Sequence, residues 1–290
     1  MNRRRFMTIC AAVAASPALA QTHSWQAQAL GGTVSIDLRG PRPLAAETGR
    51  AIADAIEAVE AAASLFRSDS ALSRLNRAGR LDHPPPMLRD LLALASRMHA
   101  ATGGVFDASV QPLWQALAEG ADPAAARARI GWEHVRVGTS VVLGNGQALT
   151  LNGIAQGYAA DKIRAMLQGA GYEQVLVDMG EYAALSGPFR IGVEDPELGL
   201  IAIHALRGDA IATSSPGAMR LGAGGHILGP AGQQPVWSTV SVQAASAGVA
   251  DGLSTAFCLM GTAAIRTAMR MLPEVSAVTA VDLKGDVTTF

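Results

Sequence analysis

The spacing of hydrophobic and polar positions changes several times along this 290-residue chain, and each change predicts a different element. Apolar and polar residues alternate over 30–38, which is the two-residue period of a strand with one buried face. From Ala45 onward the apolar residues recur every three or four positions, which predicts a helix that ends near 68–70. Its buried face would carry Ile52, Ile56, Val59, Ala63 and Phe66.

A second long helix is expected after three consecutive prolines at 84–86, because proline at a helix start sacrifices no hydrogen bond. A short helical or turn element over 70–76 precedes it. The long helix would bury one apolar face, formed by Leu88, Leu91, Leu92, Ala95 and Met98.

The second half of the chain has the pattern of short strands separated by turns that contain glycine and proline. Strands are predicted over 174–179, 189–193, 200–206 and 237–244, with turns over 211–217 and 226–235. Helices over 248–260 and 262–271 and a terminal pair of strands follow. Because strands and helices are mixed without strict alternation, the expected fold class is α+β with antiparallel pairing.

The stretch Thr150–Asp161 links an apolar run over 141–151, predicted as a strand, to a helical pattern. A strand that turns into a helix leaves free backbone N–H groups at the helix start, and these suit an anion such as a phosphate. The same stretch could equally be a plain connection that needs glycine, since such turns are common. Thr150–Asp161 is therefore a candidate ligand cradle whose role depends on its neighbours.

The N-terminus has the features of an export signal, with basic residues, a short apolar stretch over 8–19 and a small-residue ending at Ala18-Leu19-Ala20. The apolar stretch is shorter than the roughly 20 residues of a membrane span. We expect a signal peptide over 1–20, of the twin-arginine type because of Arg3 and Arg4, with an ordinary export signal as the alternative. Residues 21–290 would then form the mature, soluble periplasmic protein.

Cleavage would also change the charge and the cysteine content. It would remove Arg3, Arg4 and Arg5 and no acidic residue, so 23 basic residues would become 20 against 24 acidic ones, a net charge of −4. This balance is not the signature of a protein that binds nucleic acid or an anionic membrane. Cys10 would also be lost, so Cys258 could form no intramolecular disulfide and the fold must depend on its core.

Oxygen-bearing side chains on the helix predicted over 248–260 are the clearest candidates for chemistry. Asp251 and Thr255 are four residues apart and lie on one helical face, where they could bind a hard cation such as Mg²⁺. Alternatively, Asp251 interacts only with the helix dipole and the Thr255 hydroxyl bonds back to the preceding turn. The sequence has no Cys/His metal cluster, no G-x-S-x-G and no P-loop, so zinc, α/β-hydrolase and nucleoside-triphosphatase functions lack support.

Two further residues have two interpretations each. His226 could act as a general base near neutral pH, or it could be a surface histidine in a turn. Asp107 could cap the next helix, or it could accept hydrogen bonds from a bound heterocycle or ribose.

Short blocks along the chain occur in an order typical of one known family. They are 32–33, 68–76, 102–107, 151–161, 212–214, 226–227 and 250–256. Together they resemble the ApbE family, periplasmic FAD:protein FMN transferases, and the resemblance covers nearly the whole predicted mature chain. It implies an ApbE-like (T-fold-type) α+β fold of mixed antiparallel sheets with packed helices.

The resemblance also implies an activity and a site. The enzyme would use Mg²⁺ to cut the pyrophosphate of FAD, attach FMN to a Thr or Ser of an electron-transfer flavoprotein and release AMP. The implied metal ligands are Asp251, Thr255 and the carbonyl of Gly153, and the implied base is His226. The implied FAD contacts are Val105, Phe106, Asp107, Thr150, Gln156, Ile227 and Ser254. Implied acceptors include membrane-anchored flavin subunits of redox pumps and flavoprotein regulators of nitrous oxide reduction.

Several positions depart from the family pattern, namely Gly31, Gln156, Glu181, Ser215 with Pro216, and Gly229. Glu181 replaces the second glycine of a Gly-Gly pair, and its carboxylate would repel a pyrophosphate unless Mg²⁺ or an arginine such as Arg190 or Arg220 lies between them. A periplasmic FAD-binding or flavin-delivery protein with weakened catalysis is therefore an alternative function. A third candidate is an enzyme that mainly hydrolyses FAD to FMN and AMP.

Overall fold

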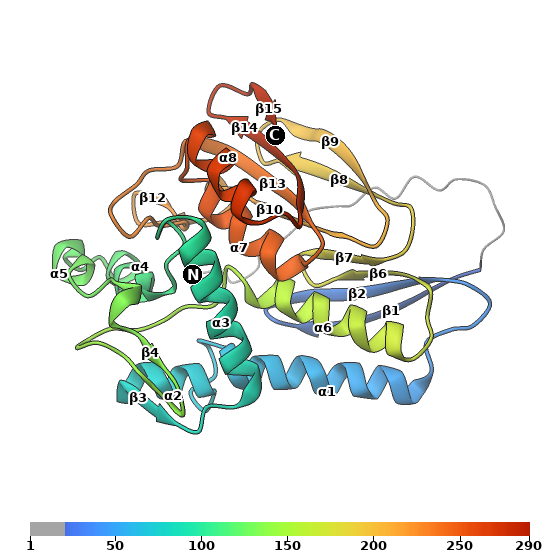
Figure 1. Ribbon diagram of the computed structural model, residues 1–290, viewed down its shortest axis with the longest axis horizontal. Helices are drawn as coiled ribbons and strands as arrows, with labels where there is room; N and C mark the ends of the chain where they lie inside the picture. Colours follow the sequence, from blue (N-terminus) through green and yellow to red (C-terminus); the bar gives the residue numbers. More distant parts are fainter. Residues whose placement is uncertain (1–20) are drawn as a thin grey trace.

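An eight-stranded antiparallel sheet lies at the centre of the molecule in a computed structural model that describes residues 21–290 (Figure 1). The predicted signal peptide and Cys10 lie outside the described residues. The strand order is β1-β2-β6-β7-β10-β13-β14-β15, and each neighbouring pair is antiparallel. The strands are β1 (Thr22–Ala29), β2 (Gly32–Arg39), β6 (Gln174–Asp178), β7 (Tyr182–Leu185), β10 (Ala210–Ser214), β13 (Trp237–Ala244), β14 (Val275–Asp282) and β15 (Val287–Thr289).

Helices cover one face of this sheet (Figure 1). Helices α1 (Ala46–Ala63) and α6 (Ala155–Gly169) bury their apolar faces with β2 and β6. Helix α7 (Ala247–Phe257) packs on β10 and β13, and it also contacts α6 and α3 (Pro86–Ala101). Helix α8 (Thr262–Met271) follows α7, and buried apolar residues of both helices belong to one hydrophobic cluster.

The opposite face of the sheet is partly covered by a hairpin of β8 (Phe189–Asp195) and β9 (Gly199–Leu206). Alternate residues of β6 show the two sides, because Val175 and Val177 join the helix-side core whereas Leu176 packs against the hairpin. Strand β10 is divided in the same way, with Ile211 on the hairpin side. Burial on both faces explains why these strands have continuous apolar runs.

Smaller elements surround this core. They are the helices α2 (Ala71–Ala78), α4 (Gln111–Glu119) and α5 (Pro123–Arg127), the strands β3 (Arg80–Asp82), β4 (Arg136–Val137), β5 (Ser140–Val142), β11 (Arg220–Leu221) and β12 (Gly224–Gly225), and the 3₁₀ turns η1 (Ala108–Val110), η2 (Trp132–His134) and η3 (Pro216–Ala218). Among the described helices, none is both long and apolar enough to cross a membrane.

The α+β class and most of the helices predicted from the sequence are confirmed. The predicted apolar face of α3 is buried, and α8 and β13 have the predicted bounds. Phe66 was wrongly placed on the buried face of α1, since that helix ends at Ala63 and Phe66 is 90% exposed. The Ser64 hydroxyl accepts hydrogen bonds from the amides of Phe66 and Arg67, so these two N–H groups beyond the helix end have partners.

Two strand predictions need correction. The expected strand over 141–151 is short, because β5 ends at Val142, although Leu149 and Leu151 are still fully buried. Residues 211–217, predicted as a turn, instead contain most of the central strand β10. Their hydroxyls are compatible with a buried strand because they find partners, such as Thr213 Oγ1 with Ser241 Oγ at 3.0 Å.

Candidate functional site

Helices α6 and α7 cross in close contact at Gly157. A Cβ atom on Gly157 would lie 2.3 Å from the carbonyl oxygen of Ala247 and 2.8 Å from Cβ of Asp251. These distances are shorter than any normal carbon contact, so only glycine fits without a shift of one helix. The physical reason for glycine here is the approach of α7, which brings Asp251 to the first turn of α6.

Each of these two helices caps the N-terminus of the other. Asp251 Oδ2 on α7 accepts the Gly157 amide of α6 at 3.1 Å. In return, the two carboxylate oxygens of Asp161 on α6 each accept an amide of α7, from Ala247 and from Gly248, both at 3.0 Å. A carboxylate at a helix start is favoured by the free N–H groups and by the helix dipole. The reciprocal caps fix the position of Asp251.

The role of Asp161 was missed in the sequence, where this residue only marked the end of the glycine-containing stretch. Ser246, the N-cap of α7, also donates its hydroxyl to Asp161 Oδ2 at 2.6 Å. The partners are 85 residues apart in sequence, so no local signal indicated their contact.

The glycine-containing stretch is a different kind of cradle from the one expected. The amides of Ile154 and Ala155 donate to Leu151, and the Gly157 amide donates to Asp251, so three of the amides expected to bind an anion are already paired. Because the Gly157 amide is directed to Asp251, the carbonyl oxygen of Gly153 receives no hydrogen bond from it. No other described residue donates a hydrogen bond to this carbonyl oxygen either, so it is available to a cation.

The structure brings the predicted metal ligands together. Asp251 is 4% exposed, and Thr255 lies one turn further along the same helix. A Cβ atom on Gly153 would lie 3.2 Å from Thr255 Oγ1, so this turn and the Thr255 hydroxyl are immediate neighbours. Ser214 Oγ of β10 lies 3.4 Å from the same hydroxyl. Strand β10 was predicted as a turn, so the sequence did not identify Ser214 as part of this site.

The donor set fits Mg²⁺. The three predicted ligands are hard oxygen donors of the kind that Mg²⁺ prefers, and Mg²⁺ usually keeps water or phosphate at its other positions. Within residues 21–290 no three His, Cys, Asp or Glu side chains come together, and Cys258 is buried with its thiol bonded to backbone carbonyls. A site of the zinc type is therefore not formed by the described residues.

Two acidic side chains in this region are buried and influence each other. Burial raises the pKa of Asp251 to about 7, although the hydrogen bond from Gly157 opposes the shift. Burial also raises the pKa of Glu181 well above its ordinary value, and the charge of Asp251 raises it further. A cation bound beside these carboxylates would favour their ionised forms.

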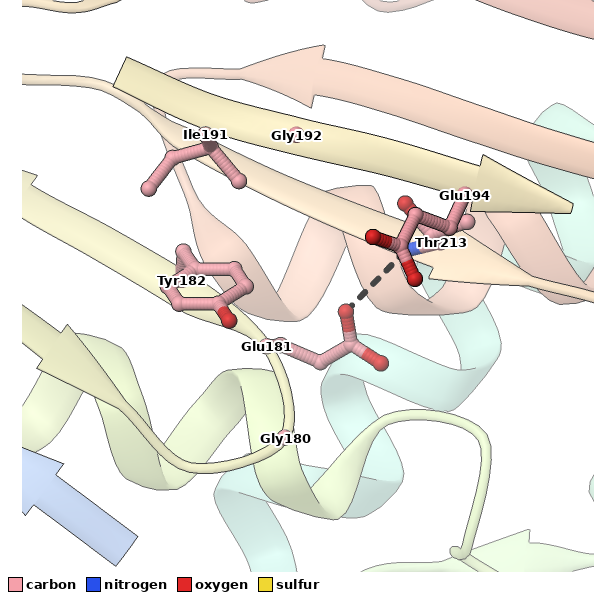
Figure 2. Close-up of a pocket in the computed structure, with 7 residues that line it drawn as sticks. All are labelled: Gly180, Glu181, Tyr182, Ile191, Gly192, Glu194 and Thr213. Atoms are coloured by element: carbon pink, nitrogen blue, oxygen red, sulfur yellow. Dashed lines mark hydrogen bonds between the residues drawn. The ribbon is translucent and has the colours of Figure 1, made fainter. Parts of the chain in front are cut away.

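Glu181 lies in the turn between β6 and β7 and lines a small cavity of about 10 Å³ (Figure 2). Figure 2 shows its side chain reaching from the turn to β10, where Oε2 accepts the Thr213 amide at 3.1 Å. Arg190 and Arg220, which the sequence suggested as partners of Glu181, are both exposed and form no ion pair with it. Gln156 lies beside this turn, since a Cβ on Gly180 would be 2.8 Å from its Nε2.

Some of the expected FAD-contact residues lie in an apolar cluster, and others make hydrogen bonds within the protein. Phe106 and Ile227 belong to one apolar cluster that Val105 also contacts, and Phe106 borders the Gly153 turn. Asp107 is a capping residue, because its carboxylate accepts the Ser109 amide and hydroxyl and the Trp132 amide. The Thr150 amide donates to Ala108, which joins this segment to the Gly153 turn.

Ser254 and Tyr158 have structural partners. Ser254 is fully buried, and its hydroxyl pairs with Ser214 Oγ at 2.8 Å and with the carbonyl of Asp251 at 3.0 Å. Tyr158, in the first turn of α6, donates its hydroxyl to Asp90 on α3 at 2.9 Å. Both residues therefore hold the elements of the site in place.

His226 begins the loop after β12 and is half-buried. Burial lowers its pKa, although the backbone of Met219 and Pro216 opposes the shift by hydrogen bonding. The ring is therefore neutral at physiological pH, and its buried Nδ1 has no hydrogen-bond partner in the described part of the chain. No hydrogen bond or ion pair joins His226 to the described Asp251 and Thr255 side chains.

Comparisons with known proteins agree with this fold and indicate a family. The model of the ApbE family matches residues 30–279. A protein named FAD:protein FMN transferase from Klebsiella pneumoniae (strain 342) is 29% identical over 68% of this chain and 67% of its own length. A protein of the same name from Salmonella typhimurium is 28% identical, over 75% of this chain and 72% of its own.

Solved structures share the fold over nearly the whole chain. The apo Pseudomonas stutzeri flavinyl transferase ApbE superposes with a TM-score of 0.79 at 25% identity, covering 98% of this chain and 96% of that one. An ApbE protein from Thermotoga maritima gives a TM-score of 0.81 at 22% identity, over 92% of this chain and 96% of that one, and this likeness concerns the fold alone.

Proposed function

The chain belongs to the ApbE family, and from this we propose that it is a Mg²⁺-dependent FAD:protein FMN transferase. It would attach FMN covalently to a Thr or Ser hydroxyl of an acceptor flavoprotein and release AMP. The two relatives compared above that carry this name match about two thirds or more of the chain.

The observation that carries the proposal is the meeting of Asp251, Thr255 and the Gly153 turn at the crossing of α6 and α7. Asp251 is buried without a basic partner among the described residues, and the neighbouring donors are a hydroxyl and a free carbonyl. An arrangement of oxygen donors around an unbalanced buried carboxylate favours a hard divalent cation. When bound, Mg²⁺ would neutralise negative charge on the pyrophosphate and on the leaving AMP.

The proposed reaction forms one P–O bond and breaks another. The acceptor hydroxyl oxygen bonds to the flavin-side phosphorus of FAD, the bond from that phosphorus to the bridging oxygen breaks, and the bridging oxygen leaves with AMP. The hydroxyl proton passes to His226, whose neutral ring can accept it because burial lowers its pKa. Phosphoryl transfer depends mainly on positioning and charge stabilisation. Phe106 and Ile227 would provide an apolar wall for a ring of FAD, while the reciprocal caps hold the metal-binding side chains rigid.

The cellular setting is part of the same proposal. Twin-arginine export of a folded protein would deliver the enzyme to the periplasm, in agreement with the signal predicted over 1–20. An acceptor there would be a redox flavoprotein, such as a flavin subunit of a redox pump or a regulator of nitrous oxide reduction.

Product analysis separates transfer from hydrolysis and from simple binding. The mature chain is incubated with FAD and Mg²⁺, with and without an acceptor domain that carries a Thr in the modification site, and the released nucleotides are quantified. Transfer predicts acceptor-dependent AMP without free FMN. AMP and free FMN in equal amounts without acceptor would indicate hydrolysis instead, and bound FAD without AMP would indicate a binding protein.

A further inference from the structure

Glu181 is a buried carboxylate with a hydrogen-bond partner at only one of its two oxygens. The residue is 9% exposed, and Oε2 accepts the Thr213 amide at 3.1 Å (Figure 2). Oε1 makes no hydrogen bond with any described residue. Because ionised carboxylates are costly to bury, the free oxygen requires a proton, a water or a cation.

Basic side chains do not balance this charge. In the described part of the chain, no Lys, Arg or His forms an ion pair with Glu181 or with Asp251. Most surface carboxylates could be solvated without a partner, but both of these side chains lie inside the protein. Two buried carboxylates that share one region without a basic partner favour a divalent cation between them.

Contacts through intervening residues connect Glu181 to the neighbourhood of the predicted metal ligands. Thr213, whose amide binds Glu181, precedes Ser214, and Ser214 Oγ lies 3.4 Å from Thr255 Oγ1. On the other side, the turn that carries Glu181 contacts Gln156, the neighbour of the Gly157 amide that binds Asp251. Glu181 therefore approaches from the sheet, and Asp251 and Thr255 approach from α7.

We propose that Glu181 is an additional ligand of the divalent cation, so that this chain holds the metal with two carboxylates rather than one. The position is a glycine in the family pattern described above, so this ligand is a property of the present chain. Mg²⁺ is commonly held by one or two carboxylates plus water and substrate phosphates. A second carboxylate neutralises the cation before the nucleotide arrives, and it lets the chain bind the metal tightly without FAD.

This inference rests on the proposed function for the identity of the site, but its test does not require catalysis. Mn²⁺, used as a spectroscopic substitute for Mg²⁺, is titrated into the mature, nucleotide-free chain, and free Mn²⁺ is measured by electron paramagnetic resonance. Glu181→Gln should weaken Mn²⁺ binding by about tenfold or more, because it removes one charged ligand. The amide oxygen can still accept the Thr213 amide, and Glu181→Gly, which restores the family residue, provides a second variant.

Glu194→Gln is the matched control, because Glu194 lines the same small cavity but is only half-buried. Its Mn²⁺ affinity should stay within about twofold of the unmodified chain, a change of about 0.4 kcal/mol or less. Equal affinity in the unmodified chain and in both Glu181 variants would overturn the inference, as would the absence of saturable binding. Glu181-dependent binding without any transfer of FMN would instead leave the inference standing and remove the proposed function.

Discussion

Asp251 Oδ2 accepts the backbone amide of Gly157 at 3.1 Å, so the helix that carries the main candidate metal ligand also caps the helix that follows the ligand-binding turn. The same carboxylate thus has a structural role and a proposed chemical role. Its position depends on the close crossing of α6 and α7.

Gly157→Ala should disrupt the helix crossing, since the new methyl group would lie 2.3 Å from the Ala247 carbonyl oxygen. Overpacking of this kind typically costs about 1–3 kcal/mol, so the free energy of unfolding in urea should fall by that amount. Gly169→Ala is the control, because Gly169 is in the last turn of the same helix and an added Cβ meets nothing within 4 Å. Equal stability of the two variants would contradict the packing role of Gly157.

Asp161→Ala should destabilise the fold because it removes both amide caps of α7 and the partner of the Ser246 hydroxyl. Loss of this partly buried cap network should cost about 2 kcal/mol, measured by thermal or urea unfolding. Asp122→Ala provides the comparison, since Asp122 caps the exposed five-residue helix α5 through one amide. A larger loss for Asp122→Ala than for Asp161→Ala would argue against the proposed coupling of the two helices.

The sequence predicted the helices better than the central strands. The face of α3 was legible because five apolar residues recur at helical spacing, and all five are buried. Strand β10 was predicted as a turn because Thr213, Ser214 and Ser215 give it a polar appearance. Their hydroxyl partners lie on distant elements, such as Ser241 on β13 and Ser254 on α7.

The candidate site was predictable only in part for the same reason. The spacing of Asp251 and Thr255 placed both on one helical face, and the structure agrees. The sequence could not show that Asp161 caps α7 or that Glu181 lies buried beside the site, because both facts depend on contacts between segments far apart in the chain. The stretch Thr150–Asp161 was interpreted as a candidate ligand cradle, but the close neighbour of Gly157 within it is α7.

The stability of the metal-free protein should fall as pH rises between about 4 and 7, because burial raises the pKa of Asp251 and, in the same direction, that of Glu181. The pKa of Asp251 is raised to about 7, whereas an unfolded Asp has a pKa of about 3.9. In this interval the folded chain keeps a proton that the unfolded chain has lost, so raising the pH favours unfolding by up to about 1.4 kcal/mol per unit. Urea unfolding in the presence of a chelator measures this slope.

Asp251→Asn should reduce that pH dependence, since the amide does not titrate, and the part that comes from Glu181, whose pKa burial also raises, should remain. Mg²⁺ should act in the opposite sense in the unmodified chain, because it binds the ionised carboxylate and therefore stabilises the fold more as pH rises. An unchanged slope in Asp251→Asn would show that Asp251 is not the group responsible.

His226→Gln should slow FMN transfer by about 100-fold to 10,000-fold, the usual contribution of a general base. Nucleotide-free Mn²⁺ binding should be unchanged, because no contact joins His226 to the candidate metal ligands among the described residues. The rate should also lose its dependence on an ionisation below neutral pH, in keeping with the lowered pKa of this histidine. A variant that retains the full rate would remove His226 as the base.

Mass spectrometry of the acceptor protein gives the most direct test of metal-dependent FMN transfer. The mature chain, FAD, Mg²⁺ and an acceptor domain are incubated together, in parallel with the Asp251→Asn variant and with a sample containing a chelator. The unmodified chain should add one FMN group to the acceptor and release one AMP for each, while the variant and the chelated sample leave the acceptor unmodified. An acceptor of unchanged mass after incubation with the folded, FAD-bound, Mg²⁺-loaded chain would contradict this function.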